Sequence, residues 1–208
     1  HKRIFKDFFT FRLEASAQRS WLDAHNVTGV LALPFHLMIV YTGIVVFHTT
    51  YVPAGIQAVY GGDDDRYFAE DFPEHKRPAA GQAAPIPDFA AFLKQGEAVW
   101  GKGRVASLTV AHPGDRAATV AVAPKIDDQL ALRSDQVVFD AQSGAEIFRS
   151  PPSEGAATTW AVMTGLHFAH FGGAGVRWIY FMLGLAGSVM IATGLMLFEV
   201  KRARKHEA

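Results

Sequence analysis

The sequence VTGVLALPFHLMIVYTGIVVFHT, residues 27–49, decides the fold. It runs for 23 residues without Lys, Arg, Asp or Glu. A helix of that length rises about 35 Å, enough to cross a hydrocarbon core of roughly 30 Å. A second uncharged run of 21 residues covers 178–198. The two runs predict transmembrane helices over residues 21–52 and 175–200, the first of them kinked at Pro34.

Between these runs the sequence is that of a small α+β unit, which we expect over residues 86–150. The segment 86–101 has apolar residues at helical spacing, with Asp88 before it and Gly101 after it. Three extended segments follow, and the last is expected to turn at Ser143-Gly144. The predicted fold class is therefore a membrane α-helical protein in which two transmembrane helices flank an exported α+β domain.

Two linkers complete the predicted domain organisation. Residues 53–85 are rich in glycine, proline and acids, which predicts an exposed, partly mobile exported linker. Its run Asp63–Asp65 could bind a hard cation, but a solvated acidic loop is the favoured interpretation. Residues 151–174 are expected to be a second linker that includes the start of a helix at the outer side.

Charge predicts the orientation. Five Lys or Arg residues lie in the basic segment 1–20, and four lie in the basic tail 201–208. By the positive-inside rule both termini face the cytoplasm, and residues 53–160 are exported to the periplasm of a Gram-negative cell. Segment 1–20 is either an amphipathic stretch at the lipid headgroups or a solvated linker.

Composition excludes several functions. The formal net charge is zero, so no basic field indicates nucleic acid as a partner. The chain has no cysteine, which excludes disulfides, thiolate metal sites and cysteine nucleophiles. No Ser/His/Asp arrangement or phosphate-binding glycine loop is present. The expected partners are membrane lipid and further transmembrane helices.

Five histidines carry the site prediction, because they lie in or next to the apolar runs: His25, His36, His48, His167 and His170. Imidazoles at two levels of a helix bundle are typical of b-type haem, whose iron is held by axial histidines. His36 at mid-depth is either a ligand or a hydrogen-bond partner of a carbonyl freed by Pro34. His167 and His170, at i and i+3, share a face if that segment is helical.

The stretches WLDAHNVTGVLALPFHLMIVYTG and GLHFAHFGGAGVRWIYFMLGLAGSVMIATGLMLF resemble the PepSY-associated transmembrane proteins, also called iron-regulated or iron-uptake membrane proteins. The segment 86–148, with its DAQSGAEIF turn, resembles a PepSY domain. In this resemblance His25 of the DAH motif and His167 of the GLH motif match the family's most characteristic histidines. His36 and His170 match those of a subset.

The resemblance implies a bacterial inner-membrane protein of iron uptake, and some relatives are haem-containing reductases of ferric siderophores. The expected axial ligands of haem b are then His25 and His167, on opposite sides of the membrane, each with a further partner. Two alternatives stay open: a membrane-anchored PepSY module that binds or regulates without catalysis, and a structural subunit of a membrane complex. Small residues on the second helix, such as Gly187 and Gly194, favour the latter.

Overall fold

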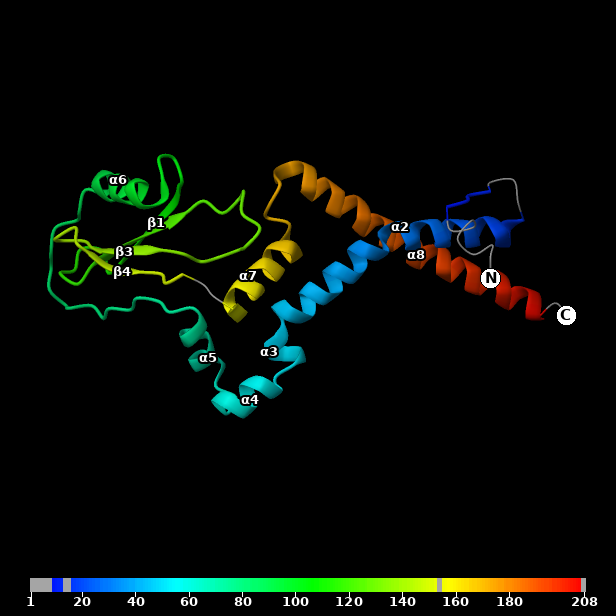
Figure 1. Cartoon of the computed structure of the whole chain (residues 1–208), viewed down its shortest axis with the longest axis horizontal. Coiled ribbons are helices and arrows are strands. Elements are labelled where there is room, and N and C mark those ends of the chain that lie inside the picture. The colour runs from blue at the N-terminus through cyan, green and yellow to red at the C-terminus, as the bar shows by residue number, and fades with distance from the viewer. Residues whose placement is uncertain (1–8, 13–15, 153–154, 207–208) are drawn as a thin grey trace.

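The computed structural model describes residues 9–12, 16–152 and 155–206, which form a helical part and an α+β unit. Helices α2 (Ala17–Val46) and α8 (Gly173–His206) cross each other, and both are long and apolar enough to span a membrane. Helix α7 (Gly155–Phe168) packs beside α2. The start of α2 and the end of α8 lie at one end of the molecule, and the α+β unit lies at the other (Figure 1).

Helix α2 is displaced towards the N-terminus from the predicted span 21–52. It begins after Ser16, whose backbone is extended. Ser20 lies inside the helix, and its hydroxyl donates a hydrogen bond to the Arg12 carbonyl at 2.8 Å. At the other end the backbone of Phe47 leaves the helical conformation, and α3 (His48–Tyr51) follows as a separate turn. Pro34 lies within α2 and does not end it.

Two short helices form within the predicted linker 53–85: α4 (Ala54–Tyr60) and α5 (Asp64–Asp71). Asp63 caps α5, since its carboxylate accepts the Arg66 backbone N–H at 2.9 Å. Negative charge is stabilised at a helix N-terminus. The acidic run therefore starts a helix instead of forming a solvated loop.

The α+β unit has the predicted order of elements. Helix α6 (Phe89–Trp100) is followed by β1 (Val105–Ala111), β2 (Thr119–Pro124), β3 (Val137–Asp140) and β4 (Glu146–Arg149). The strands form an antiparallel sheet in the order β1-β2-β3-β4. The hairpin between β3 and β4 turns at Gly144, whose φ of +70° suits glycine, as the sequence predicts.

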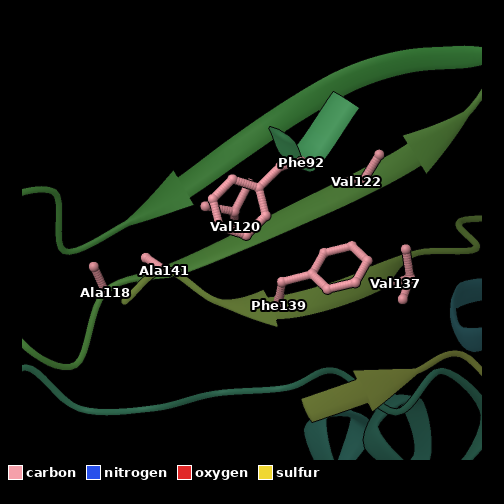
Figure 2. Close-up of a cluster of buried hydrophobic side chains, with 7 residues drawn as sticks. All are labelled: Phe92, Ala118, Val120, Val122, Val137, Phe139 and Ala141. Atoms are coloured by element: carbon pink, nitrogen blue, oxygen red, sulfur yellow. The ribbon is translucent and has the colours of Figure 1, made fainter. Parts of the chain in front are cut away.

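The core of this unit lies between α6 and the sheet (Figure 2). Its seven buried residues are Phe92, Ala118, Val120, Val122, Val137, Phe139 and Ala141. Phe92 from α6 meets Phe139 from β3 at a ring-centroid distance of 5.9 Å. Gly96 lets α6 approach the sheet, because a Cβ there would collide with Val122. The helix thus covers one face of the sheet, as expected.

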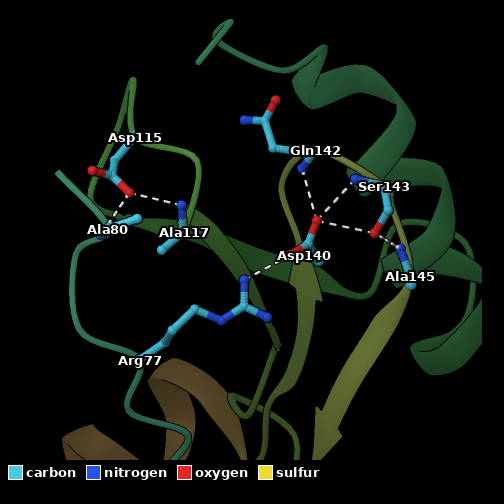
Figure 3. Close-up of polar contacts among 8 residues, drawn as sticks. All are labelled: Arg77, Ala80, Asp115, Ala117, Asp140, Gln142, Ser143 and Ala145. Atoms are coloured by element: carbon cyan, nitrogen blue, oxygen red, sulfur yellow. Dashed lines mark hydrogen bonds and ion pairs between the residues drawn. The ribbon is translucent and has the colours of Figure 1, made fainter. Parts of the chain in front are cut away.

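Two carboxylates tie the end of the predicted linker to the sheet (Figure 3). Arg77 donates to Asp140 at 2.6 Å, and this contact, with hydrogen bonds from Ser143, holds the pKa of Asp140 far below its usual value. Asp115 accepts the backbone N–H groups of Ala80 at 2.9 Å and Ala117 at 2.7 Å, which lower its pKa. This part of the chain is therefore attached to the α+β unit.

The expected linker 151–174 contains the whole of α7. That helix ends because Ala169 is left-handed, with φ +53°, and α8 then begins at Gly173. Helix α8 is longer than predicted and takes in the basic tail as far as His206. The basic segment 1–20 falls largely outside the described residues, as does the last part of the tail.

The α+β unit contacts the helices through the β2–β3 connection. Leu132 donates its backbone N–H to the Ala161 carbonyl of α7 at 2.9 Å. One turn further along α7, Gly165 lies close to the backbone carbonyl of Leu130. A Cβ on this glycine would overlap the carbonyl oxygen. This contact lies two residues before His167.

Candidate functional site

His167 lies on α7 and contacts a Thr-Gly pair of α2. Its Nδ1 is 3.1 Å from the Thr42 hydroxyl, and that hydroxyl donates back to the Met38 carbonyl at 2.8 Å. Gly43 lies under the ring, since a Cβ there would be 3.2 Å from His167 Cε1. We name Thr42 and Gly43 the outer Thr-Gly pair.

His25 lies on α2 and contacts a second Thr-Gly pair, on α8. Its Nδ1 is 2.9 Å from the Met190 carbonyl and 3.4 Å from the Thr193 hydroxyl. The Thr193 hydroxyl donates back to the Val189 carbonyl at 2.8 Å. A Cβ on Gly194 would lie 3.3 Å from His25 Cε1. We name Thr193 and Gly194 the inner Thr-Gly pair.

These contacts assign the tautomer of both rings. A carbonyl only accepts hydrogen bonds, so His25 must carry its proton on Nδ1 to bond Met190. The Thr42 hydroxyl lies closer to the Met38 carbonyl, at 2.8 Å, than to His167 Nδ1, at 3.1 Å, which favours donation to the carbonyl and a proton on Nδ1 of His167. Within the described chain neither Nε2 makes a hydrogen bond, and each keeps a lone pair that can bind a metal ion.

The end of α7 that carries His167 is held by α8. The Leu166 carbonyl has no partner within its own helix so close to the terminus, and it accepts the Tyr180 hydroxyl at 2.8 Å. The Tyr180 ring also meets Phe35 of α2 edge-on, at 5.1 Å between centroids. Three helices therefore fix the position of this histidine.

His36 packs on α8, and no polar partner for it is found among residues 9–12, 16–152 and 155–206. Gly187 leaves the space for its ring, because a Cβ there would collide with Nε2. The residue before Gly187 is Ala186, so the hydroxyl found in the two Thr-Gly pairs is lacking. In the described part of the chain no hydrogen bond joins His36 to a carbonyl near Pro34, and that alternative is wrong.

His48 has both ring nitrogens engaged. Nδ1 is 3.0 Å from the Val45 carbonyl, and Nε2 is 3.1 Å from the Tyr67 hydroxyl of α5. The carbonyl requires the proton on Nδ1, so Nε2 accepts from the tyrosine. This histidine joins the end of α2 to α5 and presents no free lone pair.

His167 and His170 would share a face only if one helix contained both, and this condition is not met. Helix α7 ends at Phe168, and left-handed Ala169 separates the two histidines. The His170 ring contacts Phe168 edge-on, with centroids 6.4 Å apart.

A buried carboxylate lies two residues before His25. Asp23 is fully buried and accepts from Arg12 at 3.3 Å and from Arg19, one turn before it, at 3.1 Å. The pair of cations offsets the cost of burying its charge. This ion cluster fixes the N-terminal part of α2.

The two imidazoles belong to separate sites. His167 contacts α2 at Thr42, which is 17 residues from His25 and so roughly 25 Å along the helix axis. Among the residues that the structure describes, no three His, Asp or Glu side chains gather to hold a metal ion. Each site therefore offers one imidazole nitrogen to a metal.

A cavity of about 620 Å³ lies between the α+β unit, the segment 70–74 and α7. Ala123 lines it from β2, on the side of the sheet opposite the core residue Val122. Its charged lining residues are Glu70, Glu74, Arg133 and Asp135. Ala161 of α7 forms part of its wall, six residues before His167.

The sequence analysis missed the four residues of the two Thr-Gly pairs. A signal was present but not specific: VYTGI and IATGL each contain a Thr-Gly dipeptide, and so does VTGV at the start of the first apolar run. Of the small residues on the second helix, Gly187 and Gly194 do lie against a facing side chain, whereas a Cβ on Gly184 would meet nothing.

The sequence comparisons agree with this architecture. A search of curated protein sequences returns no significant match. The family model of the PepSY-associated TM region matches residues 1–201, which includes both long helices, α7 and the α+β unit. The chain belongs to the PepSY-associated transmembrane family.

Proposed function

We propose that this membrane protein transfers electrons through b-type haem held by His25 and His167, and that it supports the reduction of ferric siderophores in iron uptake. One observation carries the proposal. Each imidazole donates from Nδ1 to the facing helix and leaves Nε2 without a partner among the described residues. Iron-binding histidines have this arrangement, in which the second nitrogen donates to a carbonyl or hydroxyl.

The surroundings of both histidines fit a haem ligand. Gly43 and Gly194 let the rings lie flat against the facing helix, and the buried hydroxyls of Thr42 and Thr193 line the same contacts. When bound, haem would supply a reversible one-electron Fe(III)/Fe(II) couple. Each site offers one imidazole, so the second axial ligand would come from further transmembrane helices of this or another chain.

The orientation belongs to the same proposal. We place the protein in the bacterial inner membrane with residues 53–160 in the periplasm, as the basic residues at the ends of the chain favour. Support comes from the fold, since α2 begins and α8 ends on the side opposite the α+β unit (Figure 1). His167 would then lie at the periplasmic level and His25 at the cytoplasmic level.

The cavity next to α7 is the place we propose for the ferric complex. Its volume of about 620 Å³ lies within the usual range of small-molecule sites. Ala161 in its wall is six residues from His167, which is about 9 Å along the helix. A substrate there would lie close to the outer histidine.

Absorption spectra of the purified full-length protein, oxidised and reduced with dithionite, test the proposal. The wild type is expected to show the Soret and α bands of b-type haem. His25→Ala and His167→Ala should each lose a distinct part of the signal. His48→Ala is the matched control and should keep the full spectrum, because both nitrogens of His48 already have partners. A colourless wild-type protein would exclude this function.

The second candidate function is a membrane-anchored PepSY module that binds a ligand without catalysis. The cavity favours it, because a ligand could bind there without any role for the histidines. This function predicts that His25→Ala and His167→Ala leave activity in cells intact. Growth on a ferric siderophore as the sole iron source separates the two candidates.

A further inference from the structure

We propose that Thr42 is the positioning residue of the outer site: its hydroxyl oxygen accepts the Nδ1–H of His167 and thereby fixes the tautomer that presents Nε2. The inference rests on the proposed function for the identity of the ligand. The contact between the two side chains does not depend on it.

The hydroxyl of Thr42 has only one proton, which it donates to a backbone carbonyl of its own helix. The proton goes to the Met38 carbonyl at 2.8 Å, with the Ile39 carbonyl at 3.1 Å. The lone pairs remain for His167, 3.1 Å away. Thr42 is 1% exposed, so no solvent competes for the Nδ1 proton from that side. The hydroxyl can therefore act only as an acceptor towards the imidazole.

Gly43 complements the hydroxyl by leaving the space in which the ring lies against α2. A Cβ at this position would lie 3.2 Å from Cε1 and 3.7 Å from Nδ1 of His167. The ring thus rests on the backbone of α2 while the neighbouring hydroxyl sets its rotation. A hydrogen bond from Nδ1–H also makes Nε2 a stronger donor to iron, which stabilises the ferric state.

The inner site has the same pair of residues but a different acceptor, and so provides a control within the same protein. His25 Nδ1 is 2.9 Å from the Met190 carbonyl, whereas the Thr193 hydroxyl is 3.4 Å away. A backbone carbonyl cannot be removed by substitution. The outer site should therefore depend on its threonine, and the inner site should not.

Thr42→Val tests the inference, because it keeps the shape of the side chain and removes the hydroxyl. Thr42→Ser keeps the hydroxyl, and Thr193→Val is the matched control on α8. The first readout needs no haem: ¹⁵N spectra of the histidine-labelled full-length apoprotein in detergent, with His167 assigned by its loss in His167→Gln. Wild type and Thr42→Ser should show the Nδ1–H tautomer of His167, and Thr42→Val should show a shift towards Nε2–H.

The second readout is the haem-loaded protein. Thr42→Val should bind haem at the outer site about 10–100-fold more weakly and shift its midpoint potential to more positive values. Thr42→Ser and Thr193→Val should stay close to wild type. Far-UV circular dichroism verifies folding, and Thr42→Ala replaces Thr42→Val if the valine variant does not fold.

Unchanged ¹⁵N shifts and an unchanged potential in Thr42→Val would overturn the inference while leaving the proposed function standing. An equal effect of Thr193→Val would also overturn it, because the carbonyl of Met190 would then not suffice. A wild-type protein without haem would instead overturn the proposed function. In that case the tautomer measurement alone decides the role of Thr42.

Discussion

The α+β unit and the membrane helices bury opposite kinds of residue. In the α+β unit the buried residues are mostly apolar, chiefly Phe92, Val120, Val122, Val137 and Phe139, with Thr119 the polar exception. In the helices they are small or polar: Asp23, Ala32, Thr42, Ala161, Thr164 and Thr193. Large apolar side chains of the helices point outwards, as with Leu37 and Ile191, each 64% exposed. Lipid replaces water around the helices, so hydrophobic burial no longer selects what lies inside.

This contrast explains why the candidate site is polar and closely packed. Membrane helices approach each other closely where their facing residues are small. Polar groups between the helices must form hydrogen bonds with one another, because no water is available there. Gly43 and Gly194 supply the first property, and the back-bonded hydroxyls of Thr42 and Thr193 supply the second. The histidines lie where both occur together.

The largest expected effect is that of truncating a core aromatic of the α+β unit. Phe139→Ala removes a ring that is 4% exposed and should lower the free energy of unfolding by about 3–5 kcal/mol. Phe181→Ala, at a ring 59% exposed on α8, should change it by no more than about 0.5 kcal/mol. Denaturation of the full chain in lipid nanodiscs, followed by circular dichroism, measures both. Equal losses would contradict the contrast.

The next effect concerns pH. Arg77 and Ser143 hold the pKa of Asp140 well below its usual value, so this carboxylate stabilises the fold above about pH 4 and loses its contribution as the pH falls towards its folded-state pKa. Asp140→Asn should cost roughly 1.5–3 kcal/mol at neutral pH. The difference from wild type should shrink in acid. Asp127→Asn, at an exposed position, is the control, and unfolding at several pH values measures both variants.

The smallest effect is expected where the two parts meet. Gly165→Ala places a methyl group against the Leu130 backbone carbonyl, which has to move, and should cost about 1–3 kcal/mol. Hydrogen exchange should rise in residues 126–135, next to α7. Gly184→Ala is the control, since a Cβ there meets nothing. Unchanged exchange in Gly165→Ala would show that this contact does not hold the loop.

Much of the fold could be predicted from the sequence. The length of the two runs without charged residues identified the membrane helices. The alternation of apolar residues identified the strands of the α+β unit. The helices α4, α5 and α7 were missed as complete elements. Glycine, proline and acids mark turns in general, but Asp63 shows that an acidic run also starts helices.

The candidate site could be predicted only in part. Their position in or next to the apolar runs identified the candidate histidines. It could not show which of them have a hydrogen-bond partner for Nδ1, because that partner belongs to the facing helix. Ala186 before Gly187 leaves His36 without a hydroxyl, while Thr42 supplies one to His167. Left-handed Ala169, which removes His170 from the face of His167, has no sequence signal comparable to a glycine.

The ion cluster around Asp23 sets the depth of α2 in the membrane. Moving the helix along its axis towards its C-terminal end would draw a charged carboxylate and the guanidinium groups of Arg12 and Arg19 into hydrocarbon. Moving it the opposite way would bring apolar residues such as Leu31 out of the lipid into water. The helix is thus held at one height, and His25 and Thr42 keep fixed levels within the bilayer.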